Sequence, residues 1–196
     1  MPDGYVAFVL FVIVMTGTPG AGNLSMMAIG QSRGFRAALP FLAGTTVGAV
    51  SLNLLVGFGL GGLLLASPQA AWGLRAAGMA YILYLAWKIV TMRVGPAGSA
   101  DRLTFVHGAL LHPTNPKSWA MSVVGFSQLA GAGWPFSVRV AVFVLTFLFF
   151  QVSAHSLWGL AGASLTRAFS SSRASRAVTG VLAASMVGAT ACALFL

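Results

Sequence analysis

The sequence TPGAGN at residues 18–23 interrupts an apolar run that extends over about residues 5–30. A helix that crosses a bilayer needs roughly 20 apolar residues, because it rises only about 1.5 Å per residue. This run is long enough, but Pro19 supplies no backbone N–H, and Gly20 and Gly22 relax the backbone. Unpaired backbone groups are costly in hydrocarbon, so such a break is tolerated only where it faces protein or a wet cavity. The stretch therefore predicts a discontinuous transmembrane helix, unwound over residues 18–23.

A second stretch of the same kind, HPTNPK at residues 112–117, lies about half a chain further on. Pro113 and Pro116 interrupt the apolar run over about residues 103–132. Each proline removes a helical hydrogen bond, so this run is also predicted to be a broken helix. The functional argument from the sequence depends on these two breaks together.

The composition is that of a polytopic membrane protein. The chain has 196 residues, of which 58% are hydrophobic and 7% charged, and its mean hydropathy is +0.89. The net charge of +9 comes from Lys and Arg between apolar runs, where cytoplasmic loops and anionic lipid favour them, so no nucleic-acid partner is expected. The single cysteine, Cys192, excludes an internal disulfide and a cysteine-based metal cluster.

The apolar runs and their breakers predict an all-α membrane protein with one transmembrane domain over residues 1–196. Six spans are expected, at about residues 5–30, 37–66, 71–90, 103–132, 136–165 and 177–196. The polar stretch 93–102 reads as a cytoplasmic linker between two repeats, about 1–92 and 103–196. A repeat of three spans must enter the membrane in the opposite orientation the second time. Each repeat opens with a proline-broken span, which is typical of an inverted repeat.

Basic residues predict the orientation. The loops after the first, third and fifth spans hold eight of them, and the opposite side holds two, Arg75 and Arg139. The positive side faces the cytoplasm, so both termini are expected outside, in the periplasm of a bacterial inner membrane. The eight are Arg33, Arg36, Lys88, Arg93, Arg102, Arg167, Arg173 and Arg176.

Three segments resemble the LysE/RhtB family of small amino-acid exporters. They are TPG and NL in residues 18–24 with RGFRAAL at 33–39, AYILYLAWK at 80–88, and NPKSW at 115–119. The family usually continues the Pro-Gly pair with a second proline and then Asn or Asp, where this chain has Ala21 and Gly22. The resemblance implies an inner-membrane exporter of amino acids or close derivatives that is driven by the proton gradient and forms a homodimer.

The two breaks supply groups suited to a zwitterion. The start of a half-helix offers free N–H groups for a carboxylate, and the end of one offers carbonyls for an ammonium. The alternative is that both breaks are kinks required by packing. The predicted substrate-binding residues are Thr18, Pro19, Gly20 and Asn23 in the first break and Asn115, Pro116 and Lys117 in the second.

Other polar residues are candidates for proton coupling or for the transport pathway. Lys117 would bind a carboxylate or exchange protons, or else snorkel toward the interface. Gln151 and His155 are four residues apart and share one helix face. These two, with Asn53 and His112, would line the route or simply hydrogen-bond neighbouring helices.

The acidic residues limit the chemistry. Asp3 and Asp101 are the only ones, and neither is predicted within a span. No metal site and no cofactor is expected, because a metal cation needs several oxygen, imidazole or thiolate ligands. The predicted substrate is a neutral or apolar amino acid or a related small zwitterion. Proton coupling would have to use a histidine or Lys117, or else be indirect.

We therefore expect a secondary transporter that exports small zwitterions by alternating access, in a lipid bilayer. A channel-like pore for a small neutral solute is the alternative, since channels also use discontinuous helices. An enzyme is not expected: Ser153 and His155 are two residues apart and do not face each other on a helix. The GxxxG pairs Gly44/Gly48 and Gly57/Gly61 would permit close helix approach or dimerisation.

Overall fold

The computed structural model describes residues 4–61, 66–91, 103–168 and 172–195, and within them the chain is helical without a strand. This confirms the all-α prediction. The helices are α1 (Tyr5–Gly17), α2 (Ala21–Arg33), α3 (Phe35–Gly57), α5 (Pro68–Thr91), α6 (Phe105–Thr114), α7 (Pro116–Ser127), α8 (Phe136–Ala168) and α9 (Ser172–Phe195).

Both predicted helix breaks are present, but they are shorter than expected. The first lies between α1 and α2 and bends the chain by 45°. Its non-helical residues are 18–20, and residues 21–23 already form the first turn of α2, so unwinding through Asn23 was wrong. In the second break only Asn115 leaves the helical conformation, and Pro113 remains inside α6.

Several predicted boundaries were wrong for local reasons. The second span does not continue to residue 66, because α3 ends at Gly57 and Gly59 takes a left-handed φ of 97° that suits a turn. The arginine-rich loop at 167–176 is mostly helix, since α8 ends at Ala168 and α9 begins at Ser172. The linker predicted at 93–102 lies outside the described residues.

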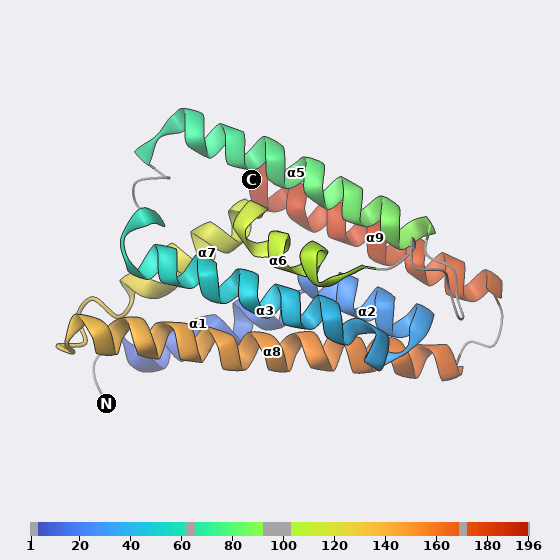
Figure 1. Ribbon diagram of the computed structural model, residues 1–196, viewed down its shortest axis with the longest axis horizontal. Coiled ribbons are helices and arrows are strands. Elements are labelled where there is room, and N and C mark those ends of the chain that lie inside the picture. Colours follow the sequence, from blue (N-terminus) through green and yellow to red (C-terminus); the bar gives the residue numbers. More distant parts are fainter. Residues whose placement is uncertain (1–3, 62–65, 92–102, 169–171, 196) are drawn as a thin grey trace.

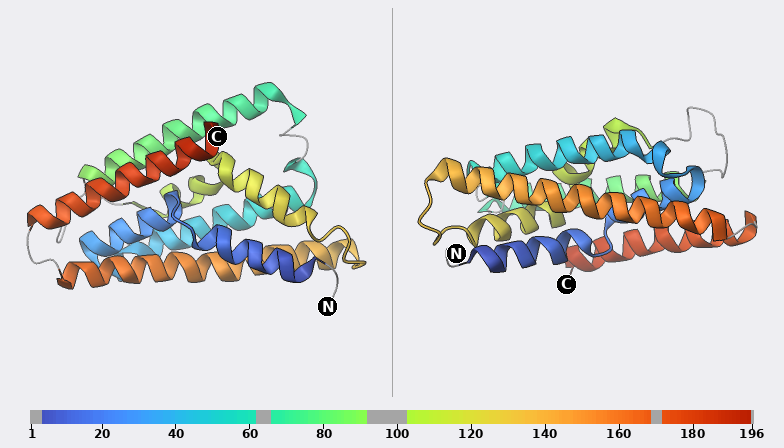
Figure 2. Two further views of the ribbon diagram at one scale, coloured as in Figure 1. Left: turned by 180° about the vertical axis from the view of Figure 1, so that it is seen from behind. Right: turned by 90° about the horizontal axis from the view of Figure 1, so that it is seen from below.

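The helices run roughly along one long axis of the molecule (Figure 1). The C-terminal ends of α2, α5 and α8 lie at the same end, on the right of that view, and Figure 2 shows the same arrangement from behind and below. By length and composition, α3 and residues Phe136–Ser164 of α8 can each cross a membrane, and the bent pair α1–α2 would make a third crossing.

Glycines allow two helix pairs to pack closely. On the α3–α6 pair, a side chain at Gly44 or Gly48 would meet the backbone carbonyls of Phe105 and Ala109. On the α2–α8 pair, Gly30 meets the carbonyl of Gly159 in the same way. The first GxxxG motif therefore serves helix packing within one chain.

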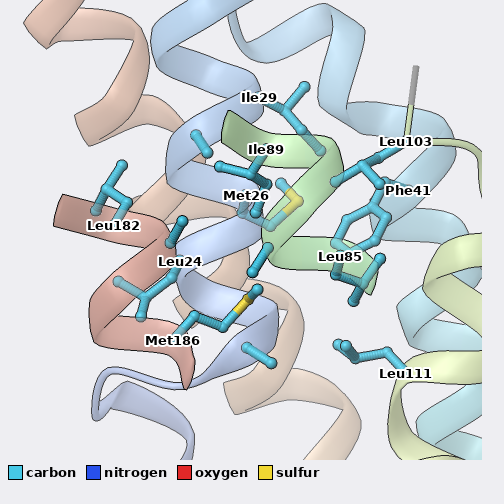
Figure 3. Close-up of a cluster of buried hydrophobic side chains, with 14 of the residues drawn as sticks. Leu24, Met26, Ile29, Phe41, Leu85, Ile89, Leu103, Leu111, Leu182 and Met186 are labelled. Atoms are coloured by element: carbon cyan, nitrogen blue, oxygen red, sulfur yellow. The ribbon is translucent and has the colours of Figure 1, made fainter. Parts of the chain in front are cut away.

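Two apolar clusters lie on either side of the breaks. One takes members from α2, α3, α5, α6 and α9, including Leu24, Phe41 and Met186, and Figure 3 shows its side chains meeting between these helices. The other takes members from α1, α3, α7 and α8, including Phe8 and Phe143. The halves of each broken helix thus belong to different clusters, and the breaks lie where the two clusters meet.

Candidate functional site

The two helix breaks face one cavity of about 60 Å³. Residues from α1, α2, α6, α7, α8 and α9 line it. Most of the predicted site residues are among them: Thr18, Gly20, Asn23, His112, Asn115, Lys117, Gln151 and His155. Segments about one hundred residues apart in sequence therefore converge on one small cavity and bring several polar side chains to it.

The first break is held in shape by side chains that cap the end of α1. Pro19 disfavours a helical conformation at the residue before it, and Thr18 accordingly has an extended ψ of 151°. Asn23 then donates both of its amide hydrogens, to the carbonyls of Thr16 at 2.7 Å and Thr18 at 2.8 Å. Trp158 donates to the carbonyl of Gly17 at 3.2 Å. The last carbonyls of α1 are therefore occupied by the chain's own donors.

The start of α2 has no such cap. Its N-cap residue, Gly20, makes no side-chain hydrogen bond, and residues 20–23 all line the cavity. The first N–H groups of a helix have no partner within the helix and carry a partial positive charge. This end of the break suits an anion.

The second break is built differently. Pro116 occupies the first helical position of α7, where its missing N–H is not needed. Asn115 caps the helix by accepting a hydrogen bond from the backbone N–H of Lys117 at 3.0 Å. Trp119 donates from Nε1 to the carbonyl of Pro113 at 2.8 Å and so joins α7 to the end of α6.

The Lys117 side chain connects the two breaks. Its Nζ lies 3.8 Å from the position that a methyl group on Gly20 would take. The ammonium is therefore beside the uncapped start of α2, where both groups would attract the same carboxylate.

Two imidazoles also line the cavity. The ring centroids of His112 and His155 are 6.0 Å apart. His112 Nδ1 lies 3.0 Å from Ser118 Oγ, and its buried Nε2 makes no hydrogen bond to the described residues. His155 Nδ1 lies 3.4 Å from Thr45 Oγ1 on α3. Gln151, one turn earlier on α8, donates to the Thr45 carbonyl at 3.5 Å.

Three predicted residues are not among those that line the cavity. Pro19 is exposed, and Pro116 packs against Gly78 of α5. Asn53 accepts a hydrogen bond from Ser122 at 2.7 Å and so joins α3 to α7. The sequence left two roles open for Asn53, and the structure contains the hydrogen bond between helices.

Sequence reasoning missed several lining residues. Gly22 stands out, because a methyl group there would clash with Nε2 of His155. A lone glycine beside other glycines gives no signal of this contact. The others are Met15, Thr16, Ala21, Leu111, Ser118, Met121, Ala189 and Thr190.

The cavity is basic and contains no carboxylate. None of the described residues that line it is Asp or Glu. Among the described residues, no group of three or more His, Cys, Asp and Glu side chains could hold a metal ion. The described lining therefore offers the ammonium of Lys117, two imidazoles and several neutral hydrogen-bonding side chains.

The chain is similar to known translocators and efflux proteins. The model of the LysE type translocator family matches residues 13–195. The cysteine/O-acetylserine efflux protein of Escherichia coli strain K12 is 30% identical over 170 residues, which are 83% of this chain and 84% of that protein. The proteins of the same description from Shigella sonnei strain Ss046 and Escherichia coli O1:K1 / APEC are 30% and 29% identical over the same shares. No solved structure matches the chain.

Proposed function

The chain belongs to the LysE type translocator family, and we propose that it exports small neutral amino acids, of the size of cysteine or O-acetylserine, through the cavity between its two helix breaks. The observation that carries this proposal is the convergence of both breaks, with their polar side chains, on one cavity. The relatives, whose names describe cysteine/O-acetylserine efflux, support the substrate class.

The cavity suits a zwitterion without a charged side chain. Lys117 and the uncapped start of α2 would hold the carboxylate. The absence of Asp and Glu from the described lining leaves a cationic side chain without a counter-charge. A volume of about 60 Å³ also favours a small substrate.

Alternating access would use two inverted repeats. In that scheme α1–α2 corresponds to α6–α7, α3 to α8, and α5 to α9. If the repeats are equivalent and α1–α2 packs on α8, then α6–α7 must pack on α3. Both packings occur. The α3–α8 and α5–α9 pairs map onto themselves. This regularity supports six spans in one transmembrane domain, with the breaks at the pivot.

The orientation follows from the same scheme. The C-terminal ends of α2, α5 and α8 lie together, as Figure 1 shows, and most of the basic residues lie near these ends in the sequence. We place that end in the cytoplasm of a bacterial inner membrane, with both termini outside. Substrate would enter from the basic end and leave in exchange for protons.

The test is counterflow in proteoliposomes loaded with L-cysteine or O-acetyl-L-serine. Lys117→Met is expected to reduce uptake of labelled substrate by about 10- to 100-fold, since a hydrogen bond to a charged group contributes roughly 1.5–3 kcal/mol. Lys88→Met is the control, because Lys88 lies over the Tyr84 ring on α5 and does not line the cavity.

Counterflow in Lys117→Met equal to that in Lys88→Met would exclude Lys117 from the site. The same assay separates a transporter from a channel-like pore. A transporter saturates with substrate and is accelerated by substrate on the opposite side, whereas a pore conducts linearly and shows no such acceleration.

A further inference from the structure

The end of α1 does not leave its carbonyls free for a substrate ammonium. Thr16, Gly17 and Thr18 already accept hydrogen bonds from Asn23 and Trp158. Asn23 donates both amide hydrogens to this cap, so only its acceptor oxygen, Oδ1, remains available to a ligand. That oxygen is buried and makes no hydrogen bond to the described residues, although Asn23 lines the cavity and is only 4% exposed. An unpaired buried acceptor costs about 1–3 kcal/mol, which a bound donor would recover.

The tautomer of His155 follows from its neighbour. Thr45 donates its one hydroxyl hydrogen to the carbonyl of Leu42 at 2.8 Å, so toward Nδ1 of His155 its oxygen can only accept. Nδ1 must then carry the hydrogen, and in the neutral imidazole Nε2 is an acceptor. Nε2 faces Gly22, directly beside Asn23 on the first turn of α2.

Among the described residues, the groups around His155 carry no negative charge. His112 on α6 and Lys117 on α7 are the titratable side chains that line the same cavity. The elements packed on α8 contribute the neutral Asn23 of α2 and Thr45 of α3, and Thr190 of α9 is neutral as well. Within the described residues, an ammonium in this cavity therefore finds neutral acceptors rather than a carboxylate.

We infer that the Nε2 lone pair of His155 binds either the substrate's ammonium or a proton, but never both. This inference rests on the proposed export function and assigns its coupling step to one atom. Asn23 Oδ1 is the second acceptor for the ammonium. When a proton occupies Nε2, the imidazole becomes a cation with no acceptor, and it repels the ammonium.

The exchange balances in charge and atoms. A proton that enters from outside occupies Nε2, and it leaves to the cytoplasm when a zwitterion takes its place. The zwitterion then leaves to the outside, where a proton replaces it. One cycle moves one zwitterion outward and one positive charge inward, so export would be driven by the membrane potential as well as by the pH gradient.

The experiment measures L-cysteine affinity of the full-length protein, kept reduced, between about pH 5 and pH 7.5, around the usual titration range of imidazole. Competition predicts an affinity that weakens by up to about tenfold for each pH unit of acidification. His155→Gln keeps an acceptor but cannot take the proton, so its affinity should not change with pH. His112→Gln and His107→Gln should keep the wild-type dependence, since His107 contacts Tyr84 and Thr104 outside the cavity.

Three results would overturn the inference: a wild-type affinity independent of pH, a dependence that persists in His155→Gln, or one that His112→Gln abolishes. If His155→Gln does not fold, 3-mercaptopropionate provides the same test in the wild type. It lacks the ammonium, so a pH dependence equal to that of cysteine would refute the competition. Failure of the wild type to show saturable counterflow would instead refute the proposed function.

Discussion

Gly22 is the residue whose substitution tests the geometry of the cavity most directly. A methyl group at this position would clash with Nε2 of His155, and it would lie 3.0 Å from Cε1 of the same ring and 3.2 Å from Leu111 Cδ2. The imidazole can escape only by rotating away from α2. In doing so it gives up its contact with Thr45, at 3.4 Å.

The cost of Gly22→Ala follows from these two changes. Loss of a typical hydrogen bond costs about 0.5–1.5 kcal/mol, and an off-rotamer side chain costs a further 0.5–1.5 kcal/mol or so. The free energy of unfolding should therefore fall by about 1–3 kcal/mol. For a chain of this length that corresponds to a decrease in melting temperature of roughly 2–12 °C. Cysteine counterflow should fall as well, since His155 leaves its position.

Gly20→Ala is the matched control, two residues away at the N-cap of α2. Gly20 has an extended φ of −161°, which any residue can adopt. A methyl group there would meet Lys117 Nζ at 3.8 Å, an ordinary contact. Thermal unfolding of the two purified variants in the same detergent compares them directly.

A double mutant separates the clash from other effects of the substitution. In a His155→Ala background, Gly22→Ala should cost much less stability, because the clashing ring is gone. Equal melting temperatures for Gly22→Ala and Gly20→Ala would refute the contact between α2 and α8. So would an unchanged cost of Gly22→Ala in the double mutant.

Two further predictions concern helix packing outside the cavity. Gly44→Ala should lower the free energy of unfolding by about 1–3 kcal/mol, because its methyl group would press on the backbone of α6 at Phe105. Gly73→Ala in α5 is the control: nothing lies within 4 Å of the added methyl group, so the melting temperature should stay the same or rise. Ser122→Ala removes the 2.7 Å hydrogen bond to buried Asn53 and should cost about 1–3 kcal/mol, while the substrate concentration at half-maximal counterflow stays the same, since neither residue lines the cavity.

The positions of both breaks could be predicted from sequence because proline acts locally. Pro19 and Pro116 each follow a residue that leaves the helical conformation, whereas Pro113 remains inside α6. The extent of unwinding could not be predicted, since it depends on partners. Asn23 lies within the first turn of α2 and reaches back to cap α1, which allows the helix to restart at Ala21.

The role of the glycines depended on tertiary structure. The GxxxG pair at Gly44 and Gly48 is compatible with contact to another chain or to the same chain. The structure places α6 against it, with Gly108 meeting the carbonyl of Phe41 from the other side. Since both helices contribute glycine, their backbones approach closely along this part of the interface.

The contact between Gly22 and His155 leads to a prediction about the whole family. The usual family pattern, as described above, has Asn or Asp at the position of Gly22. Such a side chain would occupy the space that His155 fills here. One side chain from α2 or one from α8 can present an acceptor at this point of the cavity, but both cannot fit. We therefore expect family members with Asn or Asp at this position to have a small residue in place of His155, and those with glycine to have a larger polar one. An alignment of the family measures this pairing directly, and frequent coexistence of Asn or Asp with histidine would contradict it. In the protein itself, Gly22→Asn should impair counterflow on its own and recover part of it when combined with His155→Ala, because the acceptor is then supplied from α2.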